Sequence, residues 1–196
     1  MNVPNALTLL RVVFAIAVFF CIAVYRFDFA LIFFVLASLT DFLDGWWARK
    51  FQQITVFGRI MDPFADKFLI CGTFICLVAV PELTDADCPI LLRLQPWMVI
   101  VIVGRELLIT SLRAVVESSG GDFSAKWIGK WKMGFQCIAV IACFAYLFVM
   151  QSVGPFGPMI LLAVLYFIWL LFLWATVIIT LYSGVSYCVN AARMMR

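Results

Sequence analysis

Four aspartates gather in a stretch of the chain that is otherwise strongly apolar: Asp41, Asp44, Asp62 and Asp66. Asp41 and Asp44 are three residues apart and Asp62 and Asp66 are four apart, so in a helix each pair shares one face. The residues between the pairs allow two antiparallel helices, which would bring both pairs to one depth and let them face each other. Four facing carboxylates can hold one or two divalent cations. Two such cations suit phosphoryl transfer, because they stabilise both the attacking and the leaving oxygen.

Composition narrows the chemistry of this cluster. The chain has no histidine, which excludes Ser-His and Cys-His catalysis and leaves any metal to hard oxygen ligands, so Mg²⁺ or Mn²⁺ is favoured. The seven cysteines form no CxxC pair, and we interpret them as core thiols rather than a disulfide framework or a zinc site. The alternative interpretation of the aspartates is an interfacial ion network with Arg49, Arg59 and Lys67 that performs no chemistry.

The elements that position the aspartates are predicted to be membrane helices. Hydrophobic residues make up 66% of the 196 residues, against roughly 45–50% in a soluble domain, and one span of the bilayer takes about 20 helical residues. The sequence therefore predicts an all-α polytopic membrane protein with a single domain, residues 1–196. Polar residues before Arg11 indicate that the first helix starts at the membrane interface. We expect six transmembrane helices, at about residues 5–25, 28–50, 59–80, 96–118, 127–150 and 157–184.

The basic residues are distributed unequally over the two ends of these helices. Of the 14 lysines and arginines, only Arg26 and Arg93 fall on the outer side of the expected arrangement. Because cytoplasmic loops of membrane proteins carry an excess of Lys and Arg, this asymmetry predicts that both termini and the aspartates face the cytoplasm.

The spacing of the aspartates and their neighbours resembles a known signature. The chain fits DxxDGxxAR(x8)GxxxDxxxD, which is typical of the CDP-alcohol phosphotransferase family, and all of its fixed positions match. The resemblance implies a six-helix membrane fold, a homodimer and dependence on Mg²⁺ or Mn²⁺, with two ions. The matching residues are Asp41, Asp44, Gly45, Ala48, Arg49, Gly58, Asp62 and Asp66.

Further stretches are similar to the bacterial-type members that make phosphatidylglycerophosphate: NVPNALTLLR, FGRIMDPFADKF, GRELLITSLR and SAKWIGKWKM. The loop SSGGDF departs from that pattern, because Asp122 stands where a basic residue is expected. The resemblance implies phosphatidyl transfer from CDP-diacylglycerol to sn-glycerol 3-phosphate, releasing CMP, in the phospholipid biosynthesis of a bacterial inner membrane. Inositol phosphate, or phosphatidylglycerol as in cardiolipin synthesis, remains the alternative acceptor. A cation transporter is a distant alternative, because the acids gather at one end of the helices rather than along a path.

The family likeness also implies roles for individual residues. Asp41, Asp44, Asp62 and Asp66 are expected to bind the metal, and Asp66 is expected to act also as the general base that takes the acceptor's hydroxyl proton. The acceptor's phosphate demands a separate basic pocket, whose residues could alternatively bind lipid headgroups. Glu106 is expected to orient Arg105. Asn5 and Thr8 are equally well explained as a polar helix start. The candidate CDP-binding residues are Gly45, Ala48, Arg49, Gly58, Asn5 and Thr8, and the candidate acceptor-binding residues are Arg105, Arg113, Lys130 and Lys132.

Overall fold

The structure is a computed structural model that describes residues 3–51, 56–118, 127–153 and 159–194, and it describes side chains within 5–41, 61–113, 131–153 and 159–189. Within these ranges the regular structure is entirely helical. The elements are α1 (Val3–Ala23), α2 (Phe27–Phe51), α3 (Val56–Leu77), α4 (Pro81–Thr84), the 3-10 turn η1 (Ile90–Leu92), α5 (Pro96–Ser118), α6 (Trp127–Val153) and α7 (Met159–Met194).

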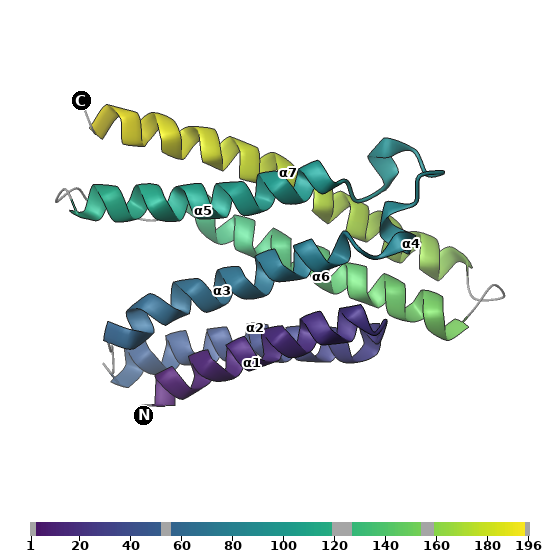
Figure 1. The fold of residues 1–196 in the computed structure, drawn as a ribbon, viewed down its shortest axis with the longest axis horizontal. Helices are drawn as coiled ribbons and strands as arrows, with labels where there is room; N and C mark the ends of the chain where they lie inside the picture. Colours follow the sequence, from purple (N-terminus) through teal and green to yellow (C-terminus); the bar gives the residue numbers. More distant parts are fainter. Residues whose placement is uncertain (1–2, 52–55, 119–126, 154–158, 195–196) are drawn as a thin grey trace.

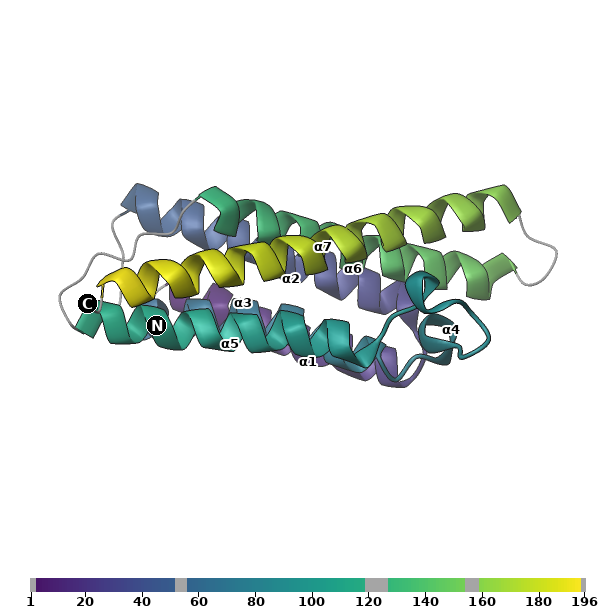
Figure 2. The same cartoon turned by 90° about the horizontal axis from the view of Figure 1, so that it is seen from above.

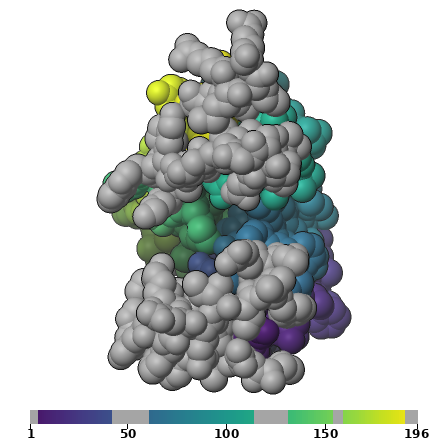
Figure 3. All heavy atoms as spheres, turned by 90° about the vertical axis from the view of Figure 1, so that its left-hand side faces the viewer, coloured from purple at the N-terminus to yellow at the C-terminus, as the bar shows by residue number. Residues whose placement is uncertain are grey.

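The long helices form a bundle whose members run along one common axis (Figures 1 and 2). The start of α1 and the end of α7 lie at the same end, and α4 lies at the opposite end (Figure 1). Helix α1 packs against α2 and α3, and α6 packs against α7 and α2. An end-on view shows α3, in blue, between α1, in purple, and α5, in teal (Figure 3). This order brings the early part of α1, the late part of α2 and the early part of α3 together at one end.

Three of the described helical segments are long and apolar enough to cross a membrane: Asn5–Ala23, Trp131–Val153 and Met159–Val189. This finding agrees with the expected all-α membrane protein, although it does not by itself give six spans. Helices α2, α3 and α5 contain most of the ionisable residues predicted to form the site, and these residues reduce the hydropathy of the helices that carry them. The six segments expected from the sequence all form helices in the structure, and α7 continues about ten residues beyond the expected end. Helix α1 is continuous from Val3, so its start is not a separate element.

The bundle is held together by aromatic and aliphatic side chains between the helices. Phe34 of α2 and Phe144 of α6 are both fully buried, and their rings meet edge to face with centroids 6.0 Å apart. On α3, Gly72 lets the ring of Phe19 lie directly against the helix backbone, because a Cβ atom at Gly72 would clash with that ring. This close contact fixes the distance between α1 and α3, the two helices that carry Arg11 and Asp66.

Candidate active site

Helix α1 presents two polar side chains to the aspartates of its neighbours. Thr8 and Arg11 are three residues apart and therefore share one face of the helix. Both are fully buried. The hydroxyl of Thr8 donates a hydrogen bond to Oδ1 of Asp62 on α3, at 2.5 Å. This contact holds the Asp62 carboxylate against α1.

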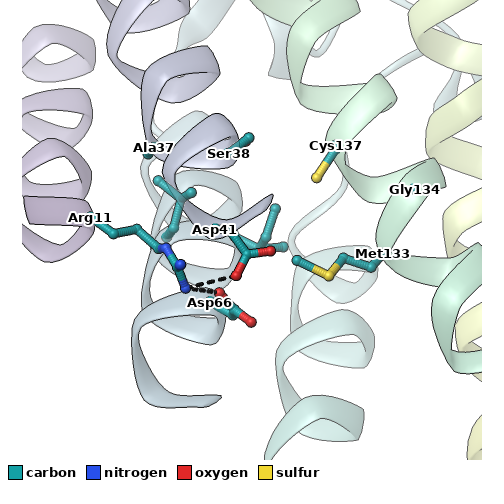
Figure 4. A pocket seen from close by; sticks show the side chains of 10 residues that line it. Arg11, Ala37, Ser38, Asp41, Asp66, Met133, Gly134 and Cys137 are labelled. Atoms are coloured by element: carbon teal, nitrogen blue, oxygen red, sulfur yellow. Dashed lines mark hydrogen bonds and ion pairs between the residues drawn. The ribbon is translucent and has the colours of Figure 1, made fainter. Parts of the chain in front are cut away.

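Arg11 joins an aspartate of α2 to an aspartate of α3. Its Nη1 atom lies 2.9 Å from Oδ1 of Asp41 and 2.5 Å from Oδ1 of Asp66 (Figure 4). The Arg11 side chain is 1% exposed, whereas the two carboxylates are about one third exposed. Asp41 and Asp66 therefore converge on a single cationic atom from two different helices. The sequence predicted that these two aspartates face each other, and the structure brings them together.

A cavity of about 460 Å³ adjoins this ion pair. Arg11, Asp41 and Asp66 form its charged end, while Met133, Gly134 and Cys137 of α6 and apolar residues of α2 and α3 complete its wall (Figure 4). The cavity therefore offers carboxylate oxygens and an arginine beside an apolar surface. That combination suits a ligand with both a charged and an apolar part.

Of the remaining residues predicted for metal and CDP binding, the structure describes the side chain of Asn5 but not those of the other five. Asn5 lies on α1 one turn before Thr8 and is partly buried. The side chains of Asp44, Gly45, Ala48, Arg49 and Gly58 lie outside the described residues. Among the side chains that are described, no group of three or more acidic, cysteine or histidine residues is close enough to share an ion. The predicted set of four metal ligands therefore remains a prediction.

The donor atoms that are described do fit a divalent cation. Asp41 and Asp66 offer hard carboxylate oxygens, the ligands that Mg²⁺ and Mn²⁺ prefer. Their Oδ1 atoms already surround one positively charged nitrogen at 2.9 and 2.5 Å. A position that is favourable for the charge of Arg11 is electrostatically favourable for a metal ion as well.

A second group of charged residues lies on α3, α5 and α6. Glu106 of α5 is buried. Its Oε1 atom forms a close ion pair with Nζ of Lys132 on α6, and the same oxygen lies 3.4 Å from Nη1 of Arg105. The Arg105 guanidinium also stands 5.5 Å from the ring centre of Tyr187 on α7. Glu106 therefore ties α5 to α6 and contacts two of the residues predicted to bind the acceptor. Lys130, also predicted for this pocket, lies outside the described side chains.

Lys67 connects this basic group to the aspartates. It follows Asp66 directly on α3, and it is close enough to Arg105, Arg113 and Lys132 to interact electrostatically with them. Lys67, Arg105, Arg113 and Lys132 thus form one basic group, in which the buried acid Glu106 pairs with Arg105 and Lys132. Such an excess of positive charge suits an anionic ligand.

Two residues of this region were not predicted as part of the site. The sequence indicated Lys67 as an ion-pair partner of the aspartates and Arg11 as a mark of the start of the first helix, and both as part of the basic side of the membrane. The sequence did contain a signal for Arg11, because an arginine within an apolar helix requires a buried acidic or polar partner. What it did not contain was which acid on which neighbouring helix would supply that partner.

The apolar helices and the adjoining acidic and basic groups define a helical membrane protein with a site suited to cations and anionic ligands. The chain matches the CDP-alcohol phosphatidyltransferase family over residues 1–182. It is 34% identical to the CDP-diacylglycerol–glycerol-3-phosphate 3-phosphatidyltransferase of Bacillus subtilis, over 95% of this chain and 93% of that protein. Proteins of the same name from Haemophilus influenzae and Escherichia coli strain K12 are 34% and 32% identical over 71% of this chain, which covers 73% and 74% of their lengths. The chain therefore belongs to the CDP-alcohol phosphatidyltransferase family and is a transferase.

Proposed function

We propose that the protein transfers the phosphatidyl group of CDP-diacylglycerol to sn-glycerol 3-phosphate, which yields phosphatidylglycerophosphate and CMP in phospholipid biosynthesis. The observation that carries this proposal is the convergence of Asp41 and Asp66 on one cationic atom beside a basic group. The names of the three relatives support the choice of donor and acceptor.

In the proposed reaction the acceptor's hydroxyl oxygen attacks the phosphorus that carries the diacylglycerol. A new phosphorus–oxygen bond forms, the bond to the bridging oxygen of the pyrophosphate breaks, and CMP leaves with that oxygen. Asp66 takes the hydroxyl proton as general base. Its carboxylate is about one third exposed at the cavity, which supports this role because a substrate can reach it.

The metal requirement is also part of the proposal. Asp41, Asp44, Asp62 and Asp66 would hold Mg²⁺ or Mn²⁺, two ions in our proposal, whose charge offsets that of the pyrophosphate. The metal dependence of the family in general supports this view. Thr8 holds Asp62 in place, and Asn5 lies one turn away on α1. Gly45, Ala48, Arg49 and Gly58 are proposed to line the path of the CDP group.

The acceptor's phosphate is proposed to bind the basic group. Arg105, Arg113, Lys130 and Lys132 provide the charge, and Glu106 holds Arg105 and Lys132 in position. Because Lys67 is next to Asp66 in the chain and interacts with this group, a phosphate bound there would leave the hydroxyl end of the acceptor near the proposed base.

The setting of the enzyme completes the proposal. We infer a single domain of six transmembrane helices, with both termini and the site at the cytoplasmic face of a bacterial inner membrane. We also infer a homodimer. The location of the start of α1 and the end of α7 at one end of the bundle supports the orientation of the termini (Figure 1).

The acceptor assignment is tested with purified protein, Mn²⁺ and CDP-diacylglycerol. We expect CMP release on addition of glycerol 3-phosphate, and little release with inositol phosphate, serine or phosphatidylglycerol. Release with only one of the other three alcohols would overturn the assignment while leaving the family reaction intact.

A further inference from the structure

Arg11 occupies an unusual position for a basic residue in an apolar helix. Its side chain is 1% exposed, and its Nη1 atom stands between Oδ1 of Asp41 and Oδ1 of Asp66. Both oxygens approach the same nitrogen, so the guanidinium lies where two negative charges from α2 and α3 meet (Figure 4). A buried charge of this kind is tolerated only with such partners.

We propose that Arg11 is the resident counter-cation of the aspartates: it neutralises Asp41 and Asp66 in the metal-free protein and is displaced into the adjoining cavity when a divalent cation binds. The inference rests on the proposed function in one respect, because it takes the aspartates to be the metal ligands. It adds a competition between a side chain of the protein and the metal for the same carboxylate oxygens.

The charges favour the exchange. One guanidinium neutralises only half of the charge of two carboxylates, whereas one divalent cation neutralises both. The metal therefore has an electrostatic advantage at this position, although it must first break the ion pairs that Arg11 forms with Asp41 and Asp66. While no metal is bound, Arg11 ties α1 to α2 and α3 at the end of the bundle where the aspartates lie.

The surroundings provide space for the displacement. Arg11 lines the cavity of about 460 Å³ together with Asp41 and Asp66, so open space lies beside its guanidinium and the two carboxylates. The hydroxyl of Thr8 on the same helix donates a hydrogen bond to Asp62 of α3. The contact between α1 and α3 at Asp62 can therefore persist while Arg11 moves.

A permanent ion pair is the competing explanation, and the two explanations predict opposite effects of removing Arg11. If Arg11 competes with the metal, its removal raises the apparent metal affinity, because the apparent affinity is reduced by the fraction of sites that are blocked. If Arg11 permanently orients the two carboxylates as metal ligands, its removal lowers the affinity.

The first experiment compares the wild-type protein with Arg11→Gln, with Mn²⁺ alone as the probe and electron paramagnetic resonance as the measure of free Mn²⁺. We expect Arg11→Gln to bind Mn²⁺ roughly threefold more tightly or better. Without metal it should unfold at a lower temperature than the wild type, and Mn²⁺ should raise its Tm by more. The matched control is Arg26→Gln, because Arg26 is an exposed arginine whose Nη2 pairs with Oδ2 of Asp28 at 2.9 Å. This control should leave the Mn²⁺ affinity, the Tm without metal and the rise in Tm on addition of Mn²⁺ unchanged.

A second experiment needs no variant and therefore remains decisive if Arg11→Gln fails to fold. Wild-type protein is treated with an arginine-specific dicarbonyl reagent with and without Mn²⁺, and the modified peptides are quantified by mass spectrometry. We expect Mn²⁺ to increase the modification of Arg11 several-fold while the modification of Arg26 stays constant.

The outcomes separate this inference from the proposed function. Equal or weaker Mn²⁺ binding by a folded Arg11→Gln, or Arg11 modification that does not increase with Mn²⁺, would overturn the competition but leave the metal site in place. Absence of Mn²⁺ binding in both proteins would overturn the metal site and the competition together.

Discussion

Arg11 of α1 and Asp66 of α3 are joined by an ion pair with 2.5 Å between Nη1 and Oδ1, and the same nitrogen reaches Asp41 of α2 at 2.9 Å. The first three helices are thus linked at one point by charge. The proposed general base belongs to this link, so its position depends on α1 as well as on its own helix.

Replacing Asp66 by Asn is expected to abolish turnover without unfolding the protein. The variant keeps the shape of the side chain but loses the proposed proton acceptor and one proposed metal ligand, and loss of a general base alone costs about 10²–10⁴-fold in rate. CMP release measures the activity, and gel filtration in detergent checks the fold. Asp28→Asn is the control, because Asp28 lies at the opposite end of α2 and pairs with Arg26. Full activity of a folded Asp66→Asn protein would refute the mechanism.

Replacing Thr8 by Val is expected to weaken metal binding. The hydroxyl of Thr8 holds Oδ1 of Asp62, and loss of a hydrogen bond that orients a metal ligand typically costs about 10–100-fold in affinity. Titration with Mn²⁺ measures the change. Thr84→Val is the control, because the Thr84 hydroxyl bonds only to the Val80 carbonyl among the described contacts, on α4 at the other end of the bundle. Unchanged Mn²⁺ affinity in Thr8→Val would contradict this role of Thr8.

Replacing Glu106 by Gln is expected to raise KM for glycerol 3-phosphate and to leave KM for CDP-diacylglycerol unchanged. Glu106 pairs with Lys132 and Arg105, and a buried cation that loses its partner costs roughly 3–5 kcal/mol. We therefore also expect a lower Tm. Glu82→Gln, on α4, is the control. Equal increases in both KM values would argue that Glu106 supports the fold rather than the acceptor site.

Replacing Gly72 by Leu is expected to destabilise the protein by roughly 1–3 kcal/mol, because overpacking forces neighbouring groups to shift. The side chain would collide with the ring of Phe19 on α1. Thermal unfolding measures the effect. Gly104→Leu is the control, because a Cβ atom there meets no described atom within 4 Å. The double variant Gly72→Leu with Phe19→Ala lacks the Phe19 ring and should recover part of the lost stability. Absence of any recovery would contradict the proposed contact.

The helices themselves could be predicted from the sequence because their apolar runs are long and are separated by polar or Pro-containing segments. The expected segment 96–118 has the same limits as α5, and the expected 28–50 differs from α2 by one residue at each end. The expected end at residue 184 lies ten residues before the end of α7 at Met194, and the polar residues Ser183, Ser186 and Asn190 lie within the helix. Helical periodicity places residues on a face but does not locate the end of a long final helix.

The partners of the charged residues were harder to predict. Spacing within a helix placed Asp41 and Asp66 on faces that could meet, and the structure brings them together at Arg11. No pattern within one helix could show that α1 supplies the cation, since that contact depends on the relative rotation of three helices. The same reason applies to Lys132 of α6, because its carboxylate partner Glu106 belongs to a different helix, α5.

The central claim is tested most directly by following the acceptor into the lipid. Glycerol 3-phosphate labelled with ¹³C is incubated with purified protein, Mn²⁺ and CDP-diacylglycerol, and both the lipid extract and released CMP are quantified by mass spectrometry. We predict labelled phosphatidylglycerophosphate in equal amount to CMP, and neither product after the metal is removed with EDTA. CMP release without label in the lipid, or Mn²⁺ flux into liposomes without any CMP release, would contradict the proposed function.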